Sequence, residues 1–125
     1  KPNVISYSAA ISACEKGGQW AKALLLLNRM EGRGVTPNVI TYSAAISACE
    51  KGGQWEGQWK NAIELLNSME SYGVHPDVIS YSAAISACEK GGQWEKALEL
   101  FNSMEGRGVT PDVISYSAAI SACEK

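Results

Sequence analysis

The chain has 125 residues, 46% of them apolar, which is enough to fill the core of one domain. Its formal net charge of −2 gives no overall attraction for nucleic acid, so any such binding needs a local stripe of charge. No apolar run approaches the ~18 residues of a membrane span and no targeting segment is visible, so we expect no membrane insertion.

A nearly identical stretch recurs four times and organises the whole sequence. It reads Val-Ile-Ser-Tyr-Ser-Ala-Ala-Ile-Ser-Ala-Cys-Glu-Lys, with Thr41 as its only substitution, and its copies begin at Val4, Val39, Val78 and Val113. The starts are spaced by 35, 39 and 35 residues, a period typical of helical solenoids, in which each repeat buries its apolar face against the next. Copies this similar also fit a designed or recently duplicated array.

Each repeat is predicted to open with a helix that starts after a proline. A good N-cap follows every one of these prolines, in Pro2-Asn3, Pro37-Asn38, Pro76-Asp77 and Pro111-Asp112. In the second repeat the helix would run from about Val39 to Lys51. Its apolar stripe at helical spacing is Val39, Tyr42, Ile46 and Cys49. Gly52 and Gly53 follow the last turn, where a C-terminal cap favours a left-handed backbone.

The rest of each repeat is predicted to form a second helix with a denser apolar stripe. In the first repeat the stripe is Trp20, Ala23, Leu24, Leu27 and Met30. In the third repeat it is Trp94, Ala97, Leu98, Phe101 and Met104. Short glycine turns follow and leave no room for strands. We therefore expect an all-α solenoid of stacked antiparallel helix pairs, divided into repeats 4–38, 39–77 and 78–112 and a lone helix at 113–125.

The second repeat is four residues longer because Gly53-Gln54-Trp55-Glu56 is followed by Gly57-Gln58-Trp59-Lys60, in which Gly-Gln-Trp recurs, and its period is 39 residues instead of 35. Trp59 aligns with Trp20 and Trp94, so Trp55 is the extra tryptophan. An insertion of about one helical turn either extends the second helix at its start or loops out between the helices. Trp55 is then either an exposed contact or ordinary apolar cover.

Several motifs in this array resemble the pentatricopeptide repeat. They are the period of 35, the Val-Ile-Ser-Tyr opening, the Ala-Cys-Glu-Lys-Gly-Gly end of the first helix, the Lys-Ala-Leu-Glu-Leu-Phe second helix and the Gly-Val-Thr-Pro-Asp linker. The tetratricopeptide signature Trp-x2-Leu-Gly-x2-Tyr is absent from the first helix. The resemblance implies a right-handed solenoid that binds single-stranded RNA, one base per repeat, in organellar RNA processing, stability or translation. It also implies a chloroplast or mitochondrial location.

The resemblance assigns roles to specific positions of each repeat. The fifth residue and the residue just before the next repeat would select the base, in the pairs Ser8 with Asn38, Ser43 with Asp77 and Ser82 with Asp112. Ser117 is the fourth such serine. A Ser–Asn pair implies adenine and a Ser–Asp pair guanine, which gives a 5′-A-G-G-3′ preference. The second residues would stack on the bases and are Ile5, Ile40, Ile79 and Ile114. The thirteenth residues would contact phosphate and are Lys16, Lys51, Lys90 and Lys125.

The residues themselves fit such a groove. Ile5, Ser8 and Ser12 step by 3 and 4 and share a helix face distinct from the apolar one. Isoleucine beside a hydroxyl would offer a base a stacking surface and a hydrogen-bonding edge. Alternatively, the serines are small packing residues of a solvated groove. A glutamate precedes each lysine and partly cancels its charge, at Glu15, Glu50, Glu89 and Glu124.

A protein-contact module is the other function that the sequence leaves open. Three stacked bases at ~1–3 kcal/mol each give weak binding, so the chain could instead be a structural or adaptor subunit contacting other proteins of a large organellar complex. Contiguous apolar surface outside the groove would favour this function. Leu25 is one hint, because Glu64 and Glu99 occupy its position in the other repeats.

No enzyme, cofactor, metal or small-molecule substrate is expected. The four cysteines occupy one equivalent position per repeat rather than the close Cys-x2-Cys pairs of metal sites, at Cys14, Cys49, Cys88 and Cys123. Helices packed ~8–10 Å apart would hold them beyond disulfide reach. We expect reduced core thiols in a reducing compartment. His75 is the single histidine and lies in a linker, so no catalytic set recurs with it.

Overall fold

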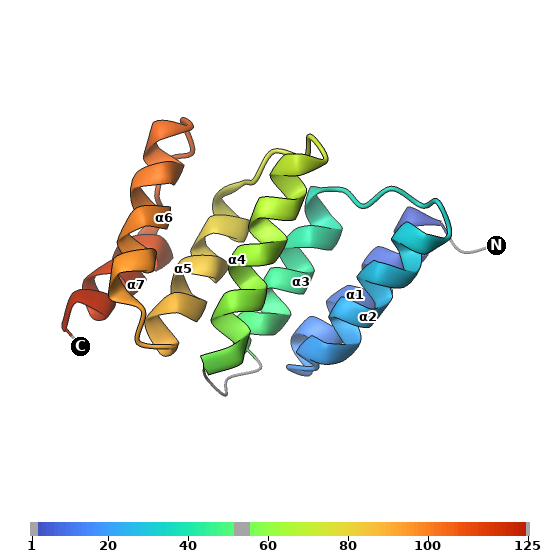
Figure 1. The fold of residues 1–125 in the computed structure, drawn as a ribbon, viewed down its shortest axis with the longest axis horizontal. Coiled ribbons are helices and arrows are strands. Elements are labelled where there is room, and N and C mark those ends of the chain that lie inside the picture. Colours follow the sequence, from blue (N-terminus) through green and yellow to red (C-terminus); the bar gives the residue numbers. More distant parts are fainter. Residues whose placement is uncertain (1–2, 52–55, 125) are drawn as a thin grey trace.

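The computed structural model describes residues 3–51 and 56–124 (Figure 1). Over these ranges it has seven helices: α1 (Val4–Lys16), α2 (Trp20–Gly32), α3 (Val39–Lys51), α4 (Glu56–Ser71), α5 (Val78–Lys90), α6 (Trp94–Gly106) and α7 (Val113–Glu124). The same ranges contain no strand, and none of their helices is long and apolar enough to cross a membrane. The predicted all-α class is confirmed.

The helices stack as antiparallel pairs into an elongated array (Figure 1). Contacts of α3 with α1 and α5, and of α5 with α7, make the first helices one continuous layer. Each second helix packs against the first helix of its own repeat and that of the next: α2 against α1 and α3, α4 against α3 and α5, and α6 against α5 and α7. This arrangement confirms the α-solenoid.

Each first helix begins at the side-chain cap predicted from the Pro-Asn and Pro-Asp pairs. The Asp77 carboxylate accepts from the Ser80 N–H at 3.0 Å, and the Ser80 hydroxyl accepts from the Asp77 N–H at 2.8 Å, which closes a capping box. The same exchange joins Thr41 with Asn38 and Ser115 with Asp112. The last residue of one repeat is therefore fixed by the third helical residue of the next.

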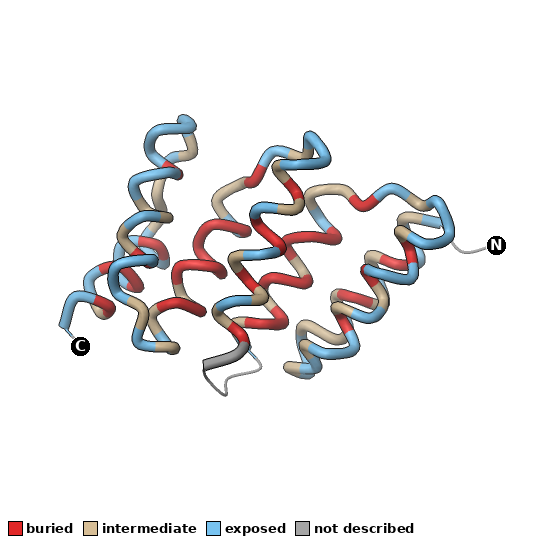
Figure 2. Tube along the Cα trace, viewed as in Figure 1, coloured by how far each residue is buried: buried red, intermediate tan, exposed pale blue. Residues whose placement is uncertain are grey.

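The core lies between the two layers and is most complete in the middle of the array. Figure 2 shows the buried residues concentrated on α3, α4 and α5. The predicted first-helix stripe supplies the tyrosines and isoleucines that are at most 1% exposed, Tyr42, Ile46, Tyr81 and Ile85. The predicted second-helix stripe supplies the fully buried alanines and methionines, Ala23, Ala62, Ala97, Met30, Met69 and Met104. Trp94 belongs to the same predicted stripe but is 47% exposed, in contrast to the half-buried Trp59.

The paired glycines after the first helices serve two purposes. Gly92 has a φ of 72° and Gly18 a φ of 69°, the left-handed backbone expected at a C-terminal cap. Gly91 has no room for a side chain, because a Cβ there would lie 2.4 Å from Trp59 Cδ1 of the preceding repeat. The equivalent glycines of the second repeat, Gly52 and Gly53, lie outside the described residues.

The second helix of the second repeat is longer than the other second helices. α4 already begins at Glu56, three residues before Trp59, and has 16 residues where α2 and α6 have 13. Because α2 and α6 both begin at the tryptophan equivalent to Trp59, the extension lies at the start of α4. From Glu56 on, the chain follows the first of the two predicted placements, and Trp55 itself lies outside the described residues.

Two equivalent tyrosines have different partners at the linker end of the repeats. The Tyr42 hydroxyl donates to the Glu31 carboxylate at 3.3 Å. The equivalent glutamate near Tyr81 is Glu70, which instead pairs with Arg107 at 2.7 Å. The Tyr81 hydroxyl is buried without a hydrogen-bond partner in the described part of the chain. An otherwise repeated core position therefore carries one satisfied and one unsatisfied hydroxyl.

The cysteines only partly match the prediction of four core thiols. All four are free; Cys49 and Cys88 are buried, whereas Cys14 is half-buried and Cys123 is exposed. The prediction is wrong for Cys123 because, in the described part of the chain, α7 packs against one second helix, α6, whereas α3 and α5 each pack against two. Burial raises the pKa of the Cys49 thiol to about 12, and burial is also the main reason why the pKa of Cys88 is about 12.

Candidate nucleic-acid interface

Four isoleucines form an exposed row across the first helices. They are the second residues of α1, α3, α5 and α7, and between 55% and 74% of each is exposed: Ile5, Ile40, Ile79 and Ile114. In contrast, Ile46 and Ile85 of the same layer are fully buried. A repeated row of large apolar side chains in solvent is typical of a binding surface. The row lies on the face that was predicted to stack on bases.

A serine and an aspartate meet beside this row in two of the repeats. The Ser82 hydroxyl donates to Asp112 Oδ1 at 3.0 Å, and the Ser43 hydroxyl donates to Asp77 Oδ1 at 3.3 Å. Each bond joins the first helix of a repeat to the last residue of the same repeat, which caps the first helix of the next one. The structure thus brings together both predicted Ser–Asp pairs.

A cavity of about 200 Å³ opens at the second of these pairs. Ile79 and Ile114 line it together with Ser82 and Asp112. Two apolar side chains and one hydrogen-bonding pair are therefore exposed to the same space. A planar group that entered this space could stack on the isoleucines and bond to the polar pair.

The first repeat differs from the other two at the selecting pair. Asn38 Oδ1 accepts from the Thr41 N–H at 3.0 Å, which leaves the side-chain amide NH₂ as a donor. No hydrogen bond joins Ser8 to Asn38, although both residues are in the described part of the chain. Ser117 of α7 is exposed and lines a neighbouring cavity of about 300 Å³ with Ile114.

The Asp112 carboxylate is held in one orientation by the fold. Its Oδ1 accepts from the Ser82 hydroxyl and, at 2.9 Å, from the Ser115 N–H. Burial alone would raise the pKa of Asp112, but hydrogen bonds from Ser115 and Ser82 outweigh it and hold the pKa below its ordinary value. The group is therefore ionised at neutral pH, and the hydrogen bonds that Asp112 accepts from Ser82 and Ser115 use Oδ1 and not Oδ2.

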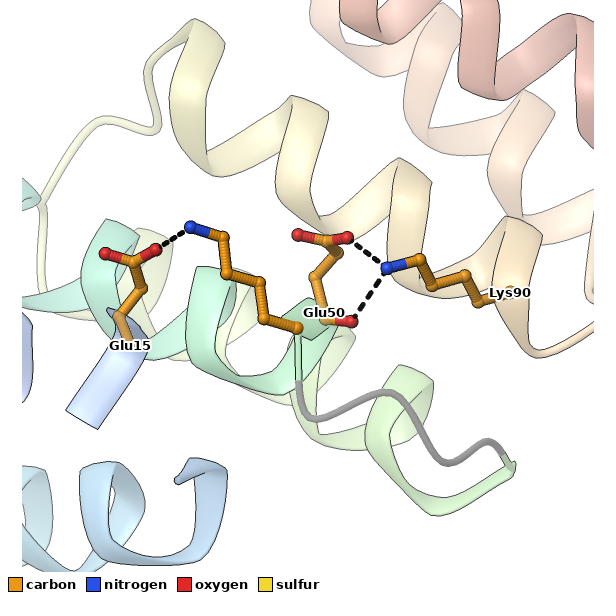
Figure 3. A network of polar contacts seen from close by, with 4 residues as sticks. Glu15, Glu50 and Lys90 are labelled. Carbon is orange, nitrogen blue, oxygen red and sulfur yellow. Dashed lines mark hydrogen bonds and ion pairs between the residues drawn. The ribbon is translucent and has the colours of Figure 1, made fainter. Parts of the chain in front are cut away.

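The predicted phosphate-contact lysines pair with glutamates across repeats (Figure 3). Lys51 of α3 pairs with Glu15 of α1, and Lys90 of α5 pairs with Glu50 of α3. The sequence indicated partial cancellation of charge between neighbours in one repeat but missed this pairing between repeats. The signal was present, because side-by-side first helices bring Glu-Lys pairs at the same height together. Lys16 has no ion-pair partner among the described residues, and Lys125 lies outside them.

The described residues show no group of three or more His, Cys, Asp or Glu side chains that could hold a metal ion. The groove therefore offers stacking surfaces, hydrogen-bond acceptors and paired charges.

Sequence comparisons point in the same direction as the groove. Family models match residues 2–51 as the PPR repeat family, 40–74 as a PPR repeat and 64–125 as a pentatricopeptide repeat domain. Together these matches extend over almost the entire chain. No curated protein sequence matches this chain.

Solved structures of similar shape include the pentatricopeptide repeat protein PPR10 in complex with an 18-nt psaJ RNA element. It is 28% identical with a TM-score of 0.82, and the match covers 95% of this chain but 17% of PPR10. The structure of PPR10 from maize is 27% identical with the same TM-score, covering 97% of this chain and 17% of that one. The PPR domain of Arabidopsis thaliana protein-only RNase P 1 in complex with tRNA is 18% identical with a TM-score of 0.82, covering 98% of this chain and 63% of its own. At that identity it supports the fold alone.

Proposed function

The chain belongs to the pentatricopeptide repeat family, and on that basis we propose that its first-helix groove binds single-stranded RNA, one base per repeat. In this proposal the isoleucine row stacks on the bases, and the Ser–Asn and Ser–Asp pairs contact the base edges. The lysines at the thirteenth position of each repeat are the cations offered to the phosphate backbone, Lys51 and Lys90 only in part because glutamates pair with them. Binding of this kind would serve RNA processing, stability or translation in a chloroplast or mitochondrion.

One observation carries the proposal. Ile79 and Ile114, each more than half exposed, line the same cavity as the Ser82–Asp112 hydrogen-bonded pair. Exposing isoleucine to water costs free energy unless a partner covers it, at about 25 cal/mol per Å² of apolar surface. A base is a partner that uses both features, since its face is apolar and its edge is polar.

The hydrogen bonds of the aspartates support guanine at the second and third positions. Asp77 and Asp112 each use Oδ1 for the serine of their own repeat and for the cap of the next first helix. The remaining oxygen can only accept while the carboxylate is ionised. The Watson–Crick edge of guanine presents two adjacent donors, N1–H and the N2 amino group, and so suits a carboxylate.

The first position favours adenine by the same reasoning. Because Asn38 Oδ1 accepts from Thr41, its NH₂ group is the part available to a base. Adenine N1 is an acceptor on the Watson–Crick edge and matches this donor. The proposed preference of the three repeats, in the order of the chain, is 5′-A-G-G-3′.

The affinity expected of this groove is modest. Stacking contributes about 1–3 kcal/mol per base, so three bases give at most about 9 kcal/mol before ordering costs. Binding in the micromolar range or weaker follows from this sum. The match covers only 17% of the PPR10 chain, whose structure contains an 18-nt RNA element. A longer array of repeats would offer more base-binding sites than this chain does.

A titration of groove variants tests whether this face binds RNA. Replacing Ile40 and Ile79 with alanine removes stacking surface at exposed positions, so the fold should persist and affinity for an A-G-G RNA should fall about tenfold. Leu25→Ala is the matched control, because Leu25 is 56% exposed on α2, outside the groove. Equal affinities for all three chains would reject the groove as the site.

A protein-contact module is the second candidate, and one observation favours it. An apolar groove of about 400 Å³ lies between α6 and α7 and is lined by Leu98, Phe101, Tyr116 and Ile120 among others. The equivalents of Tyr116 and Ile120 in α5 are Tyr81 and Ile85, which are buried. Absence of RNA binding together with capture of a helical partner at this groove would favour the second function.

A further inference from the structure

Glutamates and lysines of successive first helices form a ladder of ion pairs across the groove (Figure 3). The Lys51 ammonium pairs with the Glu15 carboxylate. The Lys90 ammonium pairs with the Glu50 carboxylate and also donates to the Glu50 backbone carbonyl at 3.2 Å. Each rung therefore joins the glutamate of one repeat to the lysine of the next.

The ladder borders the slot proposed to hold a base. Glu50 and Lys51 line the same cavity as Ile79, Ser82 and Asp112. RNA that stacked on Ile79 would therefore bring its backbone near Glu50 and Lys51. The net charge of these ion pairs would be close to zero, because each lysine ammonium lies against a glutamate carboxylate.

The glutamates are the less exposed members of both pairs. The Glu15 and Glu50 side chains are 17% and 19% exposed, against 49% and 46% for Lys51 and Lys90. A partly buried carboxylate is stabilised by a neighbouring ammonium more than an exposed one is. Lys90 also uses two of its three N–H donors on Glu50, which leaves one for another acceptor.

We propose that Glu15 and Glu50 set the RNA affinity of the groove by withholding the lysine of the following repeat from the RNA backbone. The inference rests on the proposed function of the groove. A lysine that is already neutralised displaces few counterions from RNA when it binds. Affinity and its salt dependence are therefore lower than the number of lysines in the groove implies.

The test is a pair of RNA titrations over a range of salt concentrations. In Glu15→Gln/Glu50→Gln, both lysines lose their carboxylate partners but keep their place on α3 and α5. We expect roughly tenfold tighter binding to an A-G-G RNA at about 50 mM salt. The slope of log K against log salt should also become steeper by about 0.7 for each released lysine, or about 1.4 in all.

Two further variants show whether the gain in RNA affinity depends on the lysines. Glu64→Gln/Glu99→Gln makes the same change in net charge on exposed positions of α4 and α6, and it should raise affinity much less. Adding Lys51→Gln and Lys90→Gln to the groove variant should abolish the gain. Circular dichroism of each variant establishes that the helices remain.

The outcomes separate this inference from the function on which it rests. Wild-type binding with no gain in the groove variant, or with an equal gain in the α4 and α6 control, overturns the inference alone. Weaker binding of the groove variant also overturns it, because the glutamates would then orient the lysines toward phosphate. Failure of both wild type and groove variant to bind RNA overturns the proposed function and the inference together.

Discussion

Replacing Asp77 and Asp112 with asparagine is expected to change the preferred RNA from 5′-A-G-G-3′ to 5′-A-A-A-3′. Each aspartate uses Oδ1 for the cap and for the serine, at distances from 2.9 to 3.3 Å. Asparagine retains that oxygen and is an equally good N-cap, so the helices should start where they do now. Only the second polar atom changes, from an acceptor to a donor.

The size of the change follows from the number of inverted contacts. A single hydrogen bond contributes about 1 kcal/mol, and about 1.5–3 kcal/mol when one partner is charged. At the lower limit, two positions give about 2 kcal/mol, or about a 30-fold change in relative affinity for the two RNAs. The free energy of unfolding should change little, because the Oδ1 hydrogen bonds that cap α5 and α7 are kept.

Fluorescence anisotropy with labelled A-G-G and A-A-A RNAs, titrated at roughly 50 mM salt, measures the preference. The wild type should favour A-G-G, and the double variant A-A-A. If the variant keeps the wild-type preference while its helical spectrum and melting temperature are unchanged, the aspartates do not read the bases.

Three further predictions concern the fold. Tyr81→Phe should leave the free energy of unfolding unchanged or raise it slightly, because it removes a buried hydroxyl without a partner. Tyr42→Phe should lower the free energy of unfolding by about 0.5–1.5 kcal/mol, because it removes a hydrogen bond. Chemical denaturation of both variants measures the two changes, and equal changes would contradict the difference between the two tyrosines. Gly91→Ala should destabilise the array by about 1–3 kcal/mol, because its Cβ would overlap the indole of the preceding repeat, and a lower melting temperature than that of Gly106→Ala, where nothing lies within 4 Å, would bear this out. In the folded chain at pH 8, a pKa of about 12 leaves a thiolate fraction of about 10⁻⁴, so alkylation should modify the exposed cysteine first and the two buried ones only on unfolding. The exposed residue is Cys123, and the buried ones are Cys49 and Cys88. Mass spectrometry locates the label, and rapid labelling of Cys49 or Cys88 in the folded chain would refute the packing described for them.

Local rules were sufficient to predict most of the fold from the sequence. The Pro-Asn and Pro-Asp pairs located the helix starts, since a side-chain cap needs only residues close in sequence. The spacing of Tyr42 and Ile46 identified the buried face of α3 in the same way. The repeats then fixed the stacking, because equivalent helices must bury equivalent faces.

Features that depend on neighbouring repeats were harder to predict. The ion pair between Glu15 and Lys51 joins residues far apart in sequence, and its geometry depends on how two first helices pack. The exposure of Cys123, at a position where Cys88 is buried, depends on which helices surround α7. Identical local sequence gives different environments at these sites, so periodicity alone could not distinguish them.

The most direct test of RNA binding by the groove is a titration of the wild-type chain with two short unstructured RNAs at roughly 50 mM salt, where phosphate contacts are least screened. One RNA contains A-G-G and the other C-U-U in the same context. We expect weak binding to both RNAs through stacking on the isoleucines and tighter binding, by about tenfold or more, to A-G-G. Equal affinity for the two RNAs, or no binding to either by a chain with intact helices, would contradict base reading by this groove.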